Sequence, residues 1–216
     1  MEMKKTTRTC RKLASLACAL ALILSLVPAA GAADPGNPFT DVPAGTYYHD
    51  AVLWALENSI TTGVTATQFQ PDTTCNRGQV VTFLWRAKGC PEPKTAENPF
   101  RDVSASSPFY KAILWALENG ITEGSTARKF DPRGICTSAH VVTFLWRANG
   151  KPGPSGNSAL ANEYPDQYYT DAVAWADTNG LLTGTGAPFV PGRHSPRADI
   201  VTYLYRDAAA ANTKTD

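Results

Sequence analysis

The sequence predicts an all-α, mostly helical protein that contains three copies of one helix–loop–helix unit. Two observations support this prediction: a segment that recurs at a fixed offset, and apolar residues spaced three and four apart within it. Residues 38–89 and 99–150 align at an offset of 61 without a gap, and 29 of the 52 aligned positions are identical. A shorter and more diverged third copy occupies residues 164–207. This degree of internal similarity indicates duplication of one unit.

The first 33 residues are typical of a secretory signal peptide. Basic residues within 4–12 precede an apolar run at 13–27, and small residues follow at 29–33. A run of about 15 apolar residues is short for a membrane span, which needs about 20. We therefore expect export, loss of residues 1–33, and no membrane span in the remaining chain.

The charge of the mature chain argues against nucleic-acid binding. Removal of residues 1–33 would take away five of the 20 basic and one of the 19 acidic residues, leaving a net charge of about −3. Binding to nucleic acid depends on neutralising phosphates, so a mildly acidic chain without basic runs is a poor candidate.

Three cysteines, Cys75, Cys90 and Cys136, would remain after export. An odd number cannot all pair within one chain. Cys75 and Cys136 occupy equivalent positions of the repeat, which favours small buried side chains at both. One disulfide is also compatible with an exported protein, and the sequence does not choose a pair.

Each copy begins with an extended segment and a first helix. A Phe-x-Asp-Val motif, which is Tyr-x-Asp in the third copy, leads to a helix of about ten residues around a tryptophan. The helix is followed by Asn-Ser or Asn-Gly, residues that accept the left-handed conformation of a helix C-terminus. We expect the tryptophans chiefly to anchor the core, with ligand contact as the alternative. For the aspartates we expect chiefly a capping or turn role.

A glycine-containing loop and a Phe-x-Pro motif lead to the second helix. Asn76 and Gln79 predict a capping box, and Thr137 with His140 predicts a weaker one. In the third copy Ser195 can cap the helix while Pro196 takes its first position. Proline- and glycine-rich residues 90–94 and 151–156 are expected linkers, and 208–216 an expected flexible tail. One helix pair cannot bury its large apolar residues alone, whereas three can share a core.

These motifs, in this order and three times over, resemble the S-layer homology domain. The resemblance rests on Phe-x-Asp-Val, a Trp-Ala helix, a Gly-Ile-Thr-x-Gly loop, Phe-x-Pro and a helix start similar to Thr-Arg-Ala-Glu, and it covers residues 38–89, 99–150 and 164–207. It implies a pseudo-threefold helical bundle. It also implies non-covalent binding of secondary cell-wall polysaccharide, often through a pyruvylated sugar, in grooves between copies. The expected location is secreted, at a bacterial cell wall, with no enzymatic activity and no cofactor.

The resemblance places the ligand near the start of each second helix. A pyruvyl ketal carries a carboxylate, which the fork of an arginine can meet with two charge-assisted hydrogen bonds. That arginine is present in copies one and three and is replaced by Ser138 in copy two, so we expect at most two competent grooves. The candidate ligand-binding residues are Arg77, Arg197, Asp41, Asp102, Asp166, Trp54, Trp115, Trp175, Gln79, Asp199, Gly63, Gly124 and Gly184.

No motif for catalysis or metal binding stands out. The sequence has no Gly-x-Ser-x-Gly, phosphate loop or paired-carboxylate motif. Cys136 and His140 have a spacing that metals use, but no second pair supports a zinc site. Two alternatives to the wall anchor remain. One is a structural or adaptor protein that acts through contacts with other envelope proteins, and the other, the least favoured, is a wall hydrolase.

Overall fold

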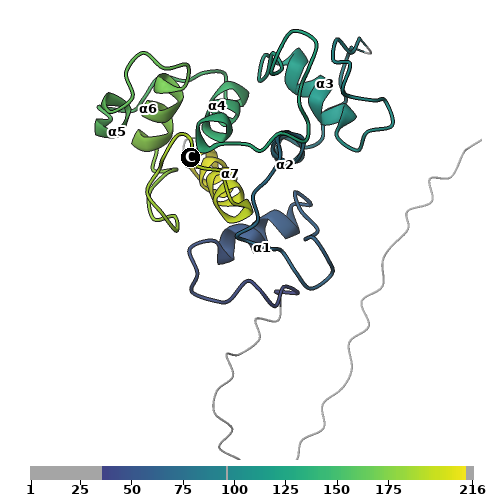
Figure 1. Ribbon diagram of the computed structural model, residues 1–216. Coiled ribbons are helices and arrows are strands. Elements are labelled where there is room, and N and C mark those ends of the chain that lie inside the picture. The colour runs from purple at the N-terminus through teal and green to yellow at the C-terminus, as the bar shows by residue number, and fades with distance from the viewer. Residues whose placement is uncertain (1–35, 96, 213–216) are drawn as a thin grey trace, which may run out of the picture. The chain divides into compact units, whose positions relative to one another are not determined.

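The computed structural model describes residues 36–95 and 97–212 of the 216-residue chain (Figure 1). The expected signal peptide lies outside the described residues, as do the last four residues of the expected tail. The described residues form seven helices and no strand longer than an isolated bridge, which confirms the all-α prediction. None of the helices in this part of the chain is long and apolar enough to cross a bilayer.

The helices follow the repeat. The first helices of the three copies are α1 (His49–Glu57), α3 (Tyr110–Glu118) and α6 (Thr170–Thr178). The second helices are α2 (Arg77–Ala87), α4 (Ser138–Ala148) and α7 (Arg197–Asn212). A single turn, α5 (Ala159–Asn162), precedes the third copy and packs against α6, and the sequence analysis did not predict this helix.

The copies are interleaved rather than stacked as separate hairpins. The first helix of each copy packs against the second helix of the copy before it, so α3 packs on α2, α6 on α4, and α1 on α7 (Figure 1). The second helices also meet one another, because α2 contacts both α4 and α7. The contact between α1 and α7 joins the first copy to the third, which closes the three copies into a ring.

Backbone hydrogen bonds complete this ring just before the second helices begin. The amide of Cys136 donates to the carbonyl of Cys75 at 3.0 Å, and the amide of Ser195 donates to Cys136 at 3.0 Å. The amide of Cys75 donates to Ser195 at 3.2 Å. Because these three residues occupy equivalent positions of the copies, the cycle is the pseudo-threefold arrangement that the resemblance implies.

At their opposite ends the three central helices are joined by side chains. The ammonium of Lys88 donates to the amide oxygen of Asn149 at 2.9 Å, and the amide nitrogen of Asn149 donates to Asp207 at 3.0 Å. Lys88 and Asn149 directly follow α2 and α4, and Asp207 lies in the second half of α7. The ring is therefore tied at both ends of its central helices.

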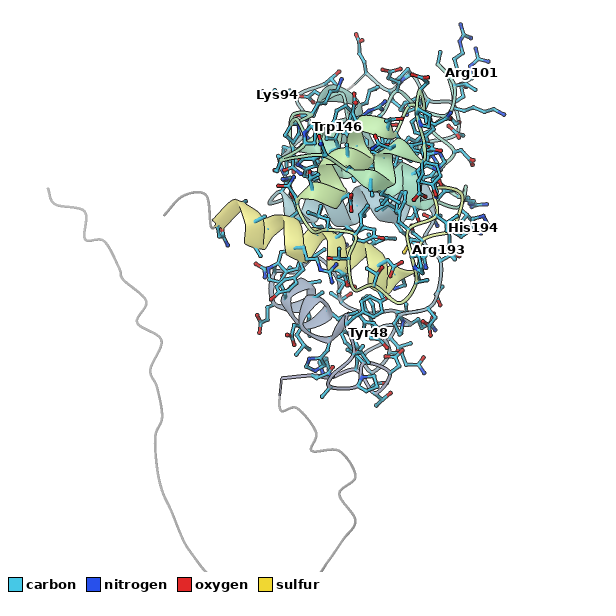
Figure 2. The ribbon with its side chains drawn as sticks, turned by 90° about the vertical axis from the view of Figure 1, so that its left-hand side faces the viewer. Tyr48, Lys94, Arg101, Trp146, Arg193 and His194 are labelled. Carbon is cyan, nitrogen blue, oxygen red and sulfur yellow. The ribbon has the colours of Figure 1, made fainter. Side chains whose placement is uncertain are left out.

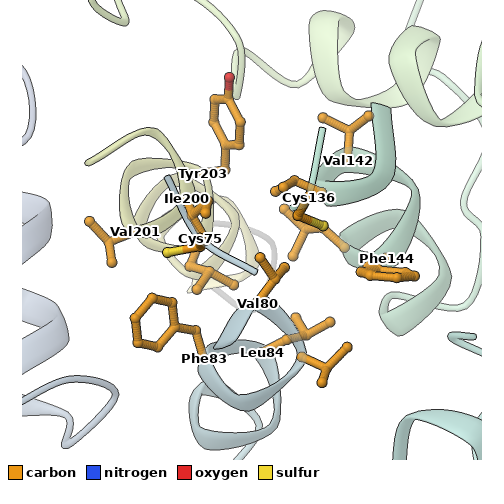
Figure 3. Packing of buried hydrophobic residues seen from close by; sticks show 14 of the residues in the cluster. Cys75, Val80, Phe83, Leu84, Cys136, Val142, Phe144, Ile200, Val201 and Tyr203 are labelled. Atoms are coloured by element: carbon orange, nitrogen blue, oxygen red, sulfur yellow. The ribbon is translucent and has the colours of Figure 1, made fainter. Parts of the chain in front are cut away.

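The two cysteines at equivalent positions of copies one and two are thiols in the hydrophobic core. Cys75 and Cys136 are fully buried and free, and their sulfur atoms point in opposite directions (Figure 3). Burial raises the pKa of Cys75 to about 11 and that of Cys136 to about 12, so both are protonated at neutral pH. Cys90 is also free but is exposed. The disulfide that the sequence left open is absent among these described cysteines.

Candidate functional site

A cavity of about 460 Å³ opens beside copy two, and residues of all three copies line it. Arg77 comes from copy one, Thr143 and His140 from α4 of copy two, and Tyr168 from copy three. This composition follows from the interleaved fold, which brings the start of one copy's second helix against the loops of the next copy. The volume is in the range of small-molecule sites.

Arg77 forms the inner wall of this cavity. Its guanidinium lies over the rings of Phe130 and Phe144, at 4.9 and 5.2 Å from their centroids, and its Nε donates to the carbonyl of Phe130 at 3.0 Å. The side chain is 7% exposed. Burial lowers the pKa of the guanidinium, yet an arginine stays charged at neutral pH. The first copy thus supplies a fixed cation to the second.

Arg197 repeats this geometry at the junction of copies three and one. Its guanidinium lies between Phe69 and Phe83, at 4.7 and 5.2 Å, and its Nε donates to the carbonyl of Phe69 at 2.9 Å. A longer hydrogen bond of 3.4 Å reaches the hydroxyl of Thr61. Two of the three junctions between copies therefore contain an arginine held by two aromatic rings and a backbone carbonyl.

The third junction, between copies two and three, has different side chains at the equivalent positions. The position of the arginine is Ser138, whose hydroxyl lies 3.2 Å from that of Ser195. The loop before α7 supplies Arg193 instead (Figure 2), and this guanidinium lies 2.5 Å from Asp199. Asp199 is fully buried and also accepts a hydrogen bond of 2.6 Å from Tyr47. The cation of this groove is thus neutralised by the protein's own carboxylate.

His140 and Tyr168 distinguish the copy-two cavity from the other grooves. Their rings stack at 6.1 Å with an interplanar angle of 29°, and Tyr168 also meets Tyr169 edge-on at 5.0 Å. Burial, and then the neighbouring Arg77 charge, lower the pKa of His140. Sequence reasoning did not select these residues for the ligand site. The Tyr168-Tyr169 pair, which becomes Pro108-Phe109 in copy two, is the signal that was available.

Two of the three candidate aspartates order a loop. The carboxylate of Asp41 accepts hydrogen bonds from the amides of Phe69 and Gln70 at 2.9 and 2.8 Å. Asp102 accepts the equivalent pair, from Phe130 and Asp131, at 3.0 and 2.8 Å. Each carboxylate therefore fixes the loop whose phenylalanine supports the arginine.

Asp166, the third candidate aspartate, differs from the other two. It is exposed and has a φ of +57°. Among the hydrogen bonds of the described residues, none is donated by the amide of Phe189, the residue equivalent to Phe69 and Phe130, to the carboxylate of Asp166, in contrast to the pairs at Asp41 and Asp102. The loop of copy three therefore lacks this tie.

The three candidate tryptophans lie in the hydrophobic packing. Trp115 and Trp175 are 6% and 5% exposed, and the half-buried Trp54 packs against Tyr205 with ring centroids 5.7 Å apart. None of them lines the copy-two cavity. Their position on the first helices serves the contact between neighbouring copies.

The candidate glycines and Gln79 have local structural roles. Gly63 and Gly124 have φ of +82° and +91°, and a Cβ there would lie 2.5 Å from Phe39 and 2.6 Å from Phe100. Gly124 also lines the cavity. At Gly184 the nearest atom to a Cβ is 3.8 Å away. Gln79 closes the capping box, since its side chain accepts from the amide of Asn76 at 3.0 Å and its own amide donates to Asn76 at 2.8 Å.

Comparison with known proteins places this architecture among surface-layer proteins. The family model of the S-layer homology domain matches residues 38–81 and 99–139. A cell surface protein of Thermoanaerobacter kivui is 31% identical over 144 residues, which is 65% of this chain and 19% of that protein. A surface-layer 125 kDa protein of Lysinibacillus sphaericus is 30% identical over 183 residues, 82% of this chain and 15% of that protein.

An endoglucanase of Bacillus sp. (strain KSM-635) is 31% identical over 216 residues, covering 90% of this chain and 22% of the endoglucanase. The chain therefore spans 19% of the length of the cell surface protein, 15% of the surface-layer 125 kDa protein and 22% of the endoglucanase. The match is therefore to a module that these proteins share and not to any one of them as a whole. Residues 38–81 and 99–139 of this chain, which include the first helices of copies one and two, therefore match the S-layer homology domain family.

Proposed function

We propose that this chain is a non-catalytic module that anchors at the bacterial cell surface by binding an acidic, pyruvylated secondary polysaccharide of the cell wall. The observation that carries the proposal is the pair of buried arginines, Arg77 and Arg197, each fixed between two aromatic rings at a junction of copies. Neither has a carboxylate partner among the described ion pairs. Asp102 and Asp131 near Arg77, and Asp41 near Arg197, act on these charges without contacting them, so each guanidinium keeps room for an anionic ligand.

The arrangement suits a polymer ligand. Two grooves on one rigid ring can bind two acidic units of the same chain, and the second contact then benefits from a high effective concentration. Weak binding at each groove would therefore still give firm attachment to a repeating polysaccharide.

The first experiment is co-sedimentation with purified wall sacculi, before and after acid extraction of the secondary polysaccharide. We expect binding that is lost on extraction. Binding that survives extraction would indicate peptidoglycan as the ligand. No binding to either preparation would contradict the proposal and favour an adaptor that acts through envelope proteins.

The arginines provide a second test. We expect Arg77→Lys or Arg197→Lys to weaken wall binding by roughly 1.5–3 kcal/mol per site, because lysine keeps the charge but loses the fork that meets a carboxylate. Ser138→Ala in the third groove is the matched control and should leave binding unchanged. Unaltered affinity of the Arg77→Lys/Arg197→Lys double variant, with its thermal midpoint intact, would remove the arginines from the site.

A further inference from the structure

His140 is a titratable residue in the lining of the copy-two cavity, at a position of the repeat that differs in each copy. The equivalent residues are Gln79, which does not titrate, and the buried Asp199, which is paired with Arg193. The imidazole lines the cavity and stacks on Tyr168 with ring centroids 6.1 Å apart. Because histidine changes its charge between about pH 5 and 8, this copy has a group that can alter the charge of its cavity in mild acid.

The other charged side chains of the cavity lining balance one another. Arg77 of α2 and Arg147 of α4 supply positive charges, and Glu123 and Asp131, from the loop between α3 and α4, supply as many negative charges. Burial raises the pKa of Tyr168, so its phenol stays neutral at neutral and acidic pH. The net charge of the lining is therefore near zero when the imidazole is neutral and positive when it is protonated.

The structure can accommodate a proton on the ring of His140. Nδ1 accepts a hydrogen bond from the amide of Thr137 at 3.3 Å, and the Thr137 hydroxyl lies 3.0 Å from the same atom. After protonation Nδ1 can donate to that hydroxyl, so the cation keeps one partner. Burial, and then the charge of Arg77, hold the pKa of His140 below its ordinary value, so the ring is neutral at neutral pH in the free protein.

Arg77 is the charge that opposes protonation of His140. Other charged or titratable side chains from segments that pack near α4 lie outside the cavity lining; they are Asp171 and Asp177 of α6, and Arg193 and His194 of the loop before α7 (Figure 2). A carboxylate bound to Arg77 offsets the guanidinium charge, and it lets the imidazole accept a proton at a higher pH.

We propose that His140 makes ligand binding at this cavity sensitive to pH, because the protonated imidazole strengthens the hold on an anionic ligand and attachment tightens as the surroundings become acidic. The inference rests on the proposed function and adds its regulation. Coupling between two bound species is reciprocal, so the ligand raises the affinity of His140 for a proton by the factor by which the proton raises the affinity for the ligand. A ligand carboxylate stays ionised above about pH 5, so the protein is the source of the pH dependence.

The test is isothermal titration of the protein with short acidic oligosaccharides released from wall sacculi, between about pH 8 and about pH 5.5. We expect affinity to rise about three- to tenfold over this range, which corresponds to a rise of about 0.5–1 in the pKa of His140 when the ligand binds. Titrations in two buffers of different ionisation enthalpy should show proton uptake on binding. The NMR titration midpoint of the His140 ring should move to higher pH in the presence of the oligosaccharides.

Two variants assign the effect to one residue. His140→Gln should abolish the pH dependence, and glutamine is suited to the position because Gln79 closes the equivalent capping box of α2. His194→Gln, which changes an exposed histidine outside the cavity lining, should keep the dependence of the wild type. The quantity compared is the ratio of affinities at the two ends of the pH range within each variant, and the thermal midpoint at each pH verifies that the variant is folded.

Two results overturn the inference and leave the proposed function intact: wild-type binding that does not change with pH, or an unchanged pH dependence in folded His140→Gln. If the wild type binds neither the oligosaccharides nor intact sacculi at any pH in the range, the proposed function itself fails, and this inference with it.

Discussion

Equivalent residues of the three copies have the same backbone role but unequal surroundings, and the glycines show this at the scale of single residues. Gly63 and Gly124 combine a positive φ with contacts closer than any real Cβ makes, whereas Gly184 has a positive φ of +62° and open space. The backbone conformation alone is costly for other residues, and the missing space adds to that cost at two of the three sites.

We predict that Gly124→Ala lowers the free energy of unfolding by about 2–4 kcal/mol, because both strain and overlap with Phe100 must be relieved. Gly184→Ala should cost only about 1 kcal/mol, since it carries the backbone strain alone. Urea denaturation of the two variants measures the difference. Equal losses would show that the close contact at Gly124 relaxes without cost.

The aspartates give a second comparison at this scale. Asp102→Ala removes two hydrogen bonds from a loop that supports the Arg77 site, and we expect a loss of about 1–3 kcal/mol of stability. Asp166→Ala changes an exposed carboxylate and should alter stability by less than about 0.5 kcal/mol. The thermal midpoints of both variants test this pair. A large effect of Asp166→Ala would reveal a role that its exposure does not suggest.

At the scale of elements, the capping box of α4 is the one that depends on pH. Nδ1 of His140 lies 3.3 Å from the amide of Thr137, which donates to it, and 3.0 Å from the Thr137 hydroxyl. Because burial and Arg77 hold the pKa of His140 below its usual value, the folded protein binds fewer protons than the unfolded chain in that interval. Stability from this residue is thus complete above about pH 6.5, the ordinary histidine value, and declines as pH falls below it.

We predict that His140→Gln removes this component of acid sensitivity, because glutamine closes the equivalent box in α2 without a titrating group. The unfolding free energies of wild type and His140→Gln, measured from pH 8 down to pH 5, should diverge below about pH 6.5, with the variant relatively more stable. Parallel pH profiles would contradict the assignment. His194→Gln, in an exposed loop, is the control for a histidine outside any cap.

At the scale of the whole molecule, interleaving makes each copy dependent on its neighbours. The contact between α1 and α7 connects the first copy to the third, and the backbone cycle of Cys75, Cys136 and Ser195 needs all three. Short-range repeats that only stack can lose a terminal unit with limited effect. A closed ring loses two junctions when one copy is removed.

We predict a single cooperative thermal transition for the intact protein. Deletion of residues 157–216 should abolish it, because α1 and α4 lose their partners. A protease site inserted after Gly156, in an exposed linker, should instead allow cleavage without dissociation, since the contacts between copies do not depend on the linker. Size-exclusion chromatography of the cleaved protein checks this. Separation of the two fragments would show that the junctions are weaker than the ring implies.

Much of the local structure could be predicted from the sequence. The offset of 61 residues reveals the repeat, and the helical spacing and capping residues predict where its helices start, which face they bury and where they end. α5 was missed because its four residues are too few to show a period. Asp41 and Asp102 were expected to cap the first helix or stabilise a local turn, but each accepts hydrogen bonds from amides of a loop 28 and 29 residues later, a long-range contact that local patterns do not indicate.

Asp199 has a different role from the equivalent Gln79 and His140, which close capping boxes. Its carboxylate binds Arg193 of the preceding loop and Tyr47 of copy one, two partners that no local pattern indicates.

The internal repeat was enough to predict three similar helical units with an arginine at two of the three equivalent helix starts. The structure adds which copy each arginine contacts, the pairing of Arg193 with Asp199 at the third junction, and the meeting of Thr143, His140 and Tyr168 at one cavity. The reason is physical: periodicity and caps act within one or two helical turns, whereas these contacts join residues of different copies. Their partners were fixed by closure of the ring, which no local pattern encodes.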